Sequence, residues 1–362
     1  MINQAQRIVV LTLIQILVIK TLCIGQNSVN KRESQNQFLT SEFFDDNPRG
    51  EQRLRLAFYN VENLFDIYDD PTKRDNDFTP SGTFRWNDFK YRKKLSGLGK
   101  TLTALGGWEG AALIGLCEVE NKLVLSDLTT FSPLSNTIYE IVHYESPDRR
   151  GIDVALLYRP DKFKLLHSEP ITVKDPDNSS FKTRDILYVK GKVQEEELHL
   201  FVNHWPSRRG GKTSSEPKRE LAAKALKEKV DSLLLTDSKS NIIIMGDFND
   251  YPDNKSISDV LKAGENNPEY DLVNLMTYFQ YKTGTHVYQG KWGVLDQFIV
   301  SKALINANDI RVSKVGAQIF RADWLLTTNA SGSETIFRTN QGPFYKGGYS
   351  DHLPIILDIE LK

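Results

Sequence analysis

Short apolar segments recur along the chain from Leu54 onward, and polar or turn-forming residues separate them. Brief runs rich in Val, Ile, Leu and aromatic residues between such breaks are typical of buried strands. On this pattern we expect strands at Leu54–Tyr59, Ala112–Cys117, Asp153–Tyr158, Ile186–Val193, Leu198–Val202, Asn241–Met245, Leu295–Val300 and Leu353–Ile359.

Two longer segments, Phe89–Leu105 and Glu216–Leu235, have the spacing of amphipathic helices. The first is followed by Gly106-Gly107, a common helix stop. In the second, the apolar residues that share one helical face are Leu221, Ala225, Leu226, Val230 and Leu233. Strands that alternate irregularly with helices predict a layered α/β (α+β) sandwich.

A short acidic loop separates the expected strands Ile186–Val193 and Leu198–Val202. Such a connection predicts an antiparallel pair, so the sheets should be mixed. No repeat of fixed period and no linker-like composition appears after Leu54. We therefore expect a single domain over residues 51–362.

The first 25 residues have the pattern of a secretory signal peptide. Ile8 to Ile24 is mostly apolar but is interrupted by Lys20, and cleavage after Gly25 fits the small residues required there. An uncleaved membrane anchor is the alternative, whereas Leu22 disfavours lipidation of Cys23. Residues 26–50 are polar and should form a flexible tether. The expected location is secreted or periplasmic, with no stable membrane span after cleavage.

The composition is that of an ordinary globular protein, with 40% hydrophobic and 26% charged residues among 362. It excludes a fibrous or wholly disordered chain. A net charge of -1 does not indicate long-range attraction to nucleic acid or membranes, although a local phosphate grip remains compatible with it. Two cysteines exclude a disulfide framework.

Acid, amide or imidazole side chains stand at the ends of most predicted strands. Residues spaced i, i+2 on an extended chain face the same side, so we expect Asn60 and Glu62 to point to one place, and likewise Asp247 and Asn249. The remaining residues of this kind are Glu118, His204, Asp296, Asp351 and His352.

Each of these features alone also has a structural interpretation. Asp and Asn are common turn formers after a strand, and Asp351-His352 would suit a simple loop. Asp296 lies within an apolar run, where a buried carboxylate needs a partner, and a histidine is a good candidate. Their joint occurrence at strand ends across the whole chain favours a functional site.

Carboxylates and amides without a Cys/His cluster are hard ligands, which suit Mg²⁺, Mn²⁺ or Ca²⁺ rather than zinc. The sequence has neither a G-x-x-x-x-G-K-[ST] loop nor a G-x-S-x-G elbow. Two histidines with nearby acids suit proton transfer. A hard dication, acids, amides and histidines together favour phosphoester hydrolysis.

An ordered set of motifs resembles the endonuclease/exonuclease/phosphatase superfamily, the deoxyribonuclease-I-like metal-dependent phosphodiesterases. The motifs are Phe58-Tyr59-Asn60-Val61-Glu62-Asn63, Gly115-Leu116-Cys117-Glu118-Val119, Asn203-His204-Trp205, Gly246-Asp247-Phe248-Asn249, Leu295-Asp296-Gln297-Phe298 and Tyr349-Ser350-Asp351-His352-Leu353-Pro354. The resemblance implies a catalytic domain with a four-layer α/β sandwich fold, in which two mixed sheets pack face to face between outer helices.

The resemblance also implies a metal site that prefers Mg²⁺, with Mn²⁺ or Ca²⁺ as alternatives. Glu118 looks like the principal metal carboxylate and Asn60 the amide beside it. Asp351 resembles a further ligand of the metal or of a metal-bound water. Glu62 is included as a metal candidate at a place where family members vary.

Catalytic roles follow from the same resemblance. Asp247 looks like the acid that activates or orients water, and Asn249 like the amide that holds the scissile phosphate. His352 resembles the histidine that contacts phosphate and transfers a proton, with Asp296 orienting it. His204 resembles a second histidine found in nuclease and sphingomyelinase branches, and Asp153 is the candidate partner for it.

A basic, glycine-rich loop, Ser207-Arg208-Arg209-Gly210-Gly211-Lys212, directly follows His204-Trp205-Pro206. We expect Arg208 and Arg209 to contact substrate phosphate, with Arg149-Arg150 and Arg184 as further candidates. A simple solvated loop is the alternative.

Three functions stay open on the sequence. A secreted metal-dependent endonuclease is favoured, with nucleic acid as substrate, no protein partner and a monomeric state. A sphingomyelinase-like lipid phosphodiesterase would use exposed aromatic residues, for which Tyr278-Phe279-Gln280-Tyr281 is the candidate. A phosphatase of the same superfamily is a related alternative, and a non-catalytic binding module is the third.

Overall fold

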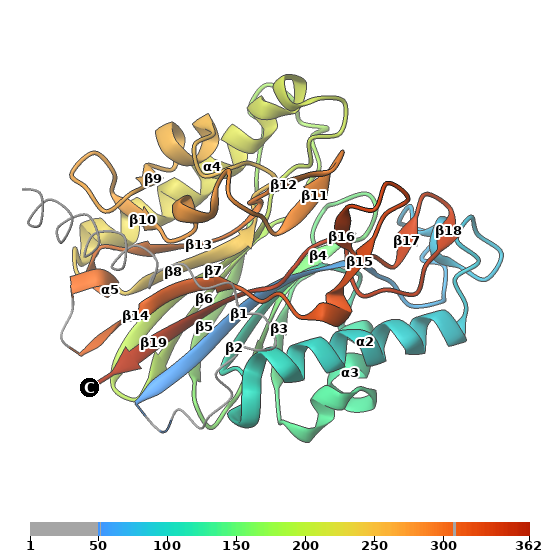
Figure 1. Ribbon diagram of the computed structural model, residues 1–362. Helices are drawn as coiled ribbons and strands as arrows, with labels where there is room; N and C mark the ends of the chain where they lie inside the picture. Colours follow the sequence, from blue (N-terminus) through green and yellow to red (C-terminus); the bar gives the residue numbers. More distant parts are fainter. Residues whose placement is uncertain (1–49, 51, 307–308) are drawn as a thin grey trace, which may run out of the picture. The chain divides into compact units, whose positions relative to one another are not determined.

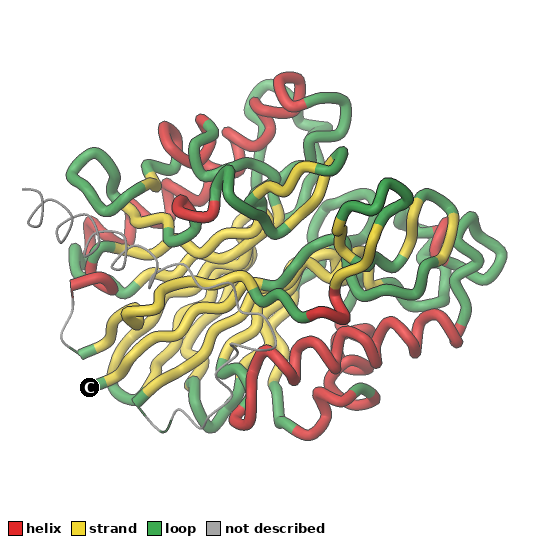
Figure 2. Tube along the Cα trace, in the orientation of Figure 1, coloured by secondary structure: helices red, strands yellow, loops and turns green. Residues whose placement is uncertain are grey.

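The computed structural model describes residues 50, 52–306 and 309–362, so most of the proposed signal peptide and tether lies outside it. The described residues all belong to one compact unit. Two large β-sheets dominate this unit, and helices flank them (Figures 1 and 2). Among the described helices, none is long and apolar enough to cross a membrane.

The first sheet has the strand order β14-β19-β1-β2-β4-β3. Strands β1 and β2 run parallel, and the other neighbours run antiparallel. The strand bounds are β1 (Arg53–Leu64), β2 (Leu113–Val119), β3 (Glu140–His143), β4 (Asp153–Tyr158), β14 (Ile310–Ile319) and β19 (Ile355–Leu361).

The second sheet has the order β5-β6-β7-β8-β13-β10-β9, with β7 parallel to β8 and β9 parallel to β10. The predicted antiparallel pair is confirmed as β6 and β7. The strand bounds are β5 (Lys164–Ile171), β6 (Ile186–Val193), β7 (Glu196–His204), β8 (Ile242–Asp247), β9 (Ala263–Gly264), β10 (Leu272–Asn274) and β13 (Asp296–Ser301).

Helices cover the outer faces of the two sheets. Helices α2 (Asp88–Gly106) and α3 (Lys122–Phe131) pack with the first sheet, and α4 (Lys212–Thr236) packs with the second. On α4, the fully buried residues against the sheet are Ala222, Ala223, Leu226 and Val230, and Leu221, Ala225 and Leu233 of the predicted face pack there partly buried. The sheets share a buried apolar layer between them. The predicted four-layer sandwich is therefore confirmed.

The remaining elements are short. The hairpins are β11 (His286–Tyr288) with β12 (Lys291–Gly293), β15 (Leu326–Thr328) with β16 (Glu334–Ile336), and β17 (Asn340–Gln341) with β18 (Phe344–Tyr345). Helix α5 spans Ala303–Asn306, and single turns lie at Asn76–Phe78, Gly107–Glu109, Pro133–Asn136, Ser256–Val260, Thr277–Phe279 and Asp323–Leu325.

All the strands and both helices expected from the sequence are present, with ends shifted by a few residues. The pattern missed β5 because much of this edge strand is exposed, so it lacks an apolar run. It missed β14 because the register of this edge strand breaks between Val312 and Ala317. Helix α3 was also missed, although Asn121 caps it by accepting a hydrogen bond from the Val124 amide.

Gly246 allows β7 and β8 to approach beside the polar strand ends. A Cβ atom at this position would lie 2.5 Å from both Cβ and the carbonyl oxygen of Asn203. Because the backbone itself would have to move, we expect Gly246→Ala to lower the free energy of unfolding by about 1–3 kcal/mol. Urea unfolding measures this loss. Lys192→Ala, which truncates a side chain that is 37% exposed on β6, serves as the control, and an equal effect of both substitutions would contradict the packing argument.

Candidate active site

The sheet topology brings the predicted polar strand ends to one edge of the sandwich. Parallel strands β1 and β2 end at the same edge, and so do β7 and β8. Antiparallel β13 begins where β8 ends, with Asp296 opposite Asp247. Strand β19 is antiparallel to β1, so Asp351-His352 enters at this edge as well. Residues far apart in sequence therefore converge.

Several residues at these strand ends have left-handed backbone, which changes the direction of their side chains. Glu62, Asn63, Glu118 and Asn249 have φ of 48°, 55°, 62° and 50°. The β1–β2 register shifts between Asn60 and Leu64, and the β2–β4 register shifts between Cys117 and Val119. Such a conformation costs a non-glycine residue about 1–3 kcal/mol, so the surrounding fold has to enforce it.

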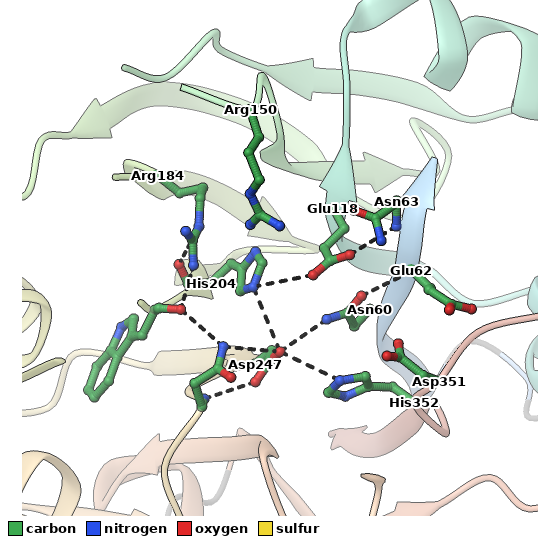
Figure 3. Close-up of polar contacts among 12 residues, drawn as sticks. Asn60, Glu62, Asn63, Glu118, Arg150, Arg184, His204, Asp247, Asp351 and His352 are labelled. Carbon is green, nitrogen blue, oxygen red and sulfur yellow. Dashed lines mark hydrogen bonds and ion pairs between the residues drawn. The ribbon is translucent and has the colours of Figure 1, made fainter. Parts of the chain in front are cut away.

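Asp247 lies at the centre of the site (Figure 3). Its Oδ2 accepts a hydrogen bond from Asn60 Nδ2 at 3.0 Å, and its Oδ1 accepts one from the Asn249 amide at 2.9 Å. The Nε2 atoms of His204 and His352 each lie 3.8 Å from Asp247 Oδ2. Asp247 is 2% exposed, so these groups fix an almost fully buried carboxylate.

His352 is paired with Asp296, as the sequence predicted. Its Nδ1 lies 2.7 Å from Asp296 Oδ2, which leaves Nε2 directed toward Asp247. Burial disfavours the imidazolium, but Asp296 and Asp247 outweigh burial and raise the pKa of His352 well above its ordinary value. His352 is therefore the proton-bearing histidine of the site.

His204 has the opposite character. Burial, reinforced by Arg184, Arg150 and His352, lowers the pKa of His204 well below its ordinary value. Its Nε2 lies 3.7 Å from Glu118 Oε1, and its Nδ1 has no hydrogen-bond partner among the described residues. The site thus combines one imidazolium with one neutral imidazole.

The predicted pairing of Asp153 with His204 is wrong. Asp153 Oδ2 lies 3.2 Å from His143 Nε2, and its Oδ1 accepts a hydrogen bond from the Ser146 amide at 2.9 Å. Asp153 opens β4, and His143 ends the adjacent strand β3. Sheet register therefore provides a nearer partner than the second sheet does.

Glu118 and Asn60 have the donor set of a hard-cation site. Glu118 Oε2 accepts a hydrogen bond from the Asn63 amide at 2.9 Å, while Oε1 is directed toward His204. Burial raises the pKa of Glu118, although Arg150 opposes the shift, so the described cations do not fully balance the carboxylate. The carboxylate and amide oxygens here fit Mg²⁺ or a similar dication.

The two other predicted metal ligands are held by Arg338. Glu62 Oε1 accepts from Arg338 Nε at 3.1 Å, and Asp351 Oδ2 accepts from Arg338 Nη2 at 2.8 Å. Burial and then Asp351 raise the pKa of Glu62 to about 7. Burial opposes ionisation of Asp351, but His352, Arg338 and other cations lower its pKa. Glu62 thus does not point with Asn60 to one spot, contrary to the i, i+2 expectation.

The predicted phosphate contacts divide into buried and exposed groups. Arg208 Nε donates to the Asn249 carbonyl at 2.7 Å and Nη2 donates to Asn254 Oδ1 at 2.9 Å, so Arg208 braces the Asp247–Asn249 turn. Arg209 is exposed. Arg184 is also structural, since its Nε donates to the His204 carbonyl at 3.2 Å.

Arg150 points into the site, toward His204 and Glu118 (Figure 3). Its side chain is 43% exposed and has only a 3.8 Å ion pair to Asp148 among the described residues. Sequence reasoning placed Arg208 first because its basic, glycine-rich loop directly follows His204-Trp205-Pro206. In the structure, Arg150 is directed toward the site, whereas Arg208 holds the Asn249 carbonyl.

Sequence reasoning missed Arg338, His286 and Lys94. The ring of His286 lies beside that of His352, tilted by 43° with the ring centroids 4.8 Å apart. Lys94 is buried on α2, and its Nζ donates to the Tyr349 carbonyl at 2.7 Å. Lys94 could have been found from the sequence, because it is a lysine within the apolar face of a predicted helix. Arg338 lies in an irregular segment, where no pattern indicates its role.

Asp296→Asn tests the origin of the His352 charge. Burial lowers the pKa of His352, and the substitution removes one of the two carboxylates that raise it. The pKa of His352 should therefore fall by roughly one to three pH units. NMR titration of the imidazole measures it, with His352→Gln assigning the resonance. His199, whose ring nitrogens lie by Tyr188 and Glu197 and away from the site, serves as the internal control and should keep its pKa. A wild-type His352 that titrates at its ordinary pKa would contradict the interpretation.

Among curated proteins, none matches the sequence significantly. The human Nocturnin catalytic domain, solved with a bound sulfate anion, is 16% identical, with a TM-score of 0.52 over 86% of this chain and 95% of that chain. Humanised TDP2 of D. rerio is 15% identical, with a TM-score of 0.54 over 85% and 99%.

A mannosyl-6-phosphatase of Bacteroides thetaiotaomicron is 16% identical, with a TM-score of 0.54 over 84% of this chain and 99% of that chain. Likeness at these identities supports the fold alone. The family model described as Endonuclease/Exonuclease/phosphatase family matches residues 55–361, which is most of the chain. The protein therefore belongs to the endonuclease/exonuclease/phosphatase family of metal-dependent hydrolases that act on phosphoester bonds.

Proposed function

We propose that this hydrolase is a divalent-metal-dependent endonuclease that cleaves nucleic-acid phosphodiester bonds. The observation that carries the proposal is the pair of histidines, His204 and His352, each with Nε2 3.8 Å from the same Asp247 oxygen. The resemblance of His204 to the second histidine of phosphodiesterase branches favours a diester over a monoester.

The residues divide the work of hydrolysis by their charge. A dication held by Glu118 and Asn60 would polarise a phosphoryl oxygen, and Mg²⁺ is the proposed ion. Asp247 would orient or deprotonate the attacking water, and the imidazolium of His352 would donate a proton or a hydrogen bond to the phosphate. Asn249 Nδ2 donates to the Trp205 carbonyl at 3.0 Å, so a phosphate contact would have to replace that bond.

A lipid substrate receives less support. The aromatic candidate for membrane contact contains a single helical turn, Thr277–Phe279, in which Phe279 is buried. Tyr281 is exposed, but its hydroxyl donates to Asp253. These residues do not form an exposed aromatic hairpin. Export from the cytoplasm stays a proposal that rests on residues 1–25 alone.

A substrate panel tests the proposal. Covalently closed plasmid DNA, RNA, sphingomyelin and a phosphate monoester would each be incubated with Mg²⁺ and with a chelator. We expect nicking of the closed plasmid, abolished by chelator and reduced at least about 100-fold by His352→Ala or Asp247→Ala. Circular dichroism would check that both variants fold. Activity confined to lipid or monoester would overturn the nuclease assignment.

Arg150→Met tests whether the inward-pointing arginine binds substrate phosphate. Losing a charge-assisted hydrogen bond should raise KM about tenfold or more with a smaller effect on kcat. Arg149→Met is the matched control, because Arg149 donates instead to the exposed Ser180 carbonyl. Steady-state kinetics on one oligonucleotide measure both constants. Equal KM values for the two variants would remove Arg150 from the binding site.

A further inference from the structure

Arg338 links two carboxylates that belong to different parts of the first sheet. It lies between β16 and β17, and its guanidinium contacts Glu62 at the end of β1 and Asp351 before β19. Glu62 is only 4% exposed, whereas the Arg338 side chain is 44% exposed at the mouth. One planar cation thus holds a buried and a more accessible carboxylate together.

The other contacts of this group complete the arrangement. Glu62 Oε2 accepts a hydrogen bond from the Thr339 amide at 2.6 Å, so both of its oxygens are occupied. The buried Lys94 bonds to the Thr339 hydroxyl and the Tyr349 carbonyl, on the same short stretches that carry Arg338 and Asp351. Arg338 therefore contacts both carboxylates directly, and Lys94 fixes the two stretches that carry Arg338 and Asp351.

Without the guanidinium, Asp351 would belong to a set of metal donors. The ligand atoms of His286 and Asp351 lie within 4.8 Å of each other and of a ring nitrogen of His352, which would have to give up its proton to bind a metal. Glu62 faces the same guanidinium, so it could supply a second carboxylate to an ion placed there. A guanidinium presents its donors in a rigid fork and keeps its charge at any pH of interest, so it satisfies both carboxylates permanently.

We infer that Arg338 occupies the position of a second cation, so that the active site binds a single divalent ion at Glu118 and Asn60. Arg338 is a positioning residue in this view, since it acts through Glu62 and Asp351. The inference rests on the metal-dependent part of the proposed function and not on the identity of the substrate.

Counting bound ions tests the inference directly. Mn²⁺ binding to the full chain can be followed by the electron paramagnetic resonance signal of the free ion. We expect one Mn²⁺ per wild-type chain and two per Arg338→Met chain. Adding Glu62→Gln to that variant should weaken the second ion at least about tenfold, because one of its carboxylates is gone. Arg338→Lys should bind the second ion more weakly than Arg338→Met does.

Arg311→Met is the matched control. Arg311 forms a 2.8 Å ion pair with Glu360 near the far end of β19. The control substitution therefore removes the same charge at a place away from the site. It should leave the count at one. Thermal unfolding with and without Mn²⁺ would verify that each variant is folded at the temperature of the assay.

The possible failures are distinguishable. Two ions in the wild type, or one ion in a folded Arg338→Met variant, would overturn the role of Arg338 and leave the proposed function intact. No bound ion in the wild type would overturn both. A failed nuclease panel together with the expected ion counts would remove the nucleic-acid substrate only.

Discussion

The buried carboxylate of Asp247 is the group on which the rest of the site depends. Two amides donate to it, and two imidazoles lie at the same distance from one of its oxygens. A carboxylate removed from water is stable as an anion only with such partners. These partners come from both sheets. The site therefore forms only when the two sheets are packed against each other.

The opposite protonation of the two histidines follows from their second neighbours. Asp296 adds a second carboxylate to His352, whereas Arg184 and Arg150 add positive charge near His204. Two identical side chains against the same Asp247 therefore acquire different chemistry. The difference between the two histidine pKa values therefore arises from charged residues on neighbouring strands and loops. The order of the strands decides which charges lie near each histidine.

The part of the site that was predictable from the sequence is the part with regular backbone. Asp247, His204 and His352 follow from the rule that strand ends of a sheet meet, and the Asp296 pairing follows from the energy of burying a carboxylate. The prediction that Glu62 points to the same place as Asn60 is wrong because the backbone of Glu62 is left-handed. The i, i+2 rule holds only for extended backbone, so it does not give the direction of the Glu62 side chain. Arg338 and the Asp153–His143 pair depend on irregular segments and strand register, on which the hydrophobic pattern carries no information.

The bracing of the Asp247–Asn249 turn by Arg208 has a further consequence. This side chain reaches back from the glycine-rich loop that opens α4 and also stacks over Tyr251, with its guanidinium carbon 4.2 Å from the ring centroid. The loop is thereby anchored at its root while its tip, with Arg209, stays in solvent. A change in the length or sequence of the loop beyond this anchor therefore need not move Asp247 or Asn249.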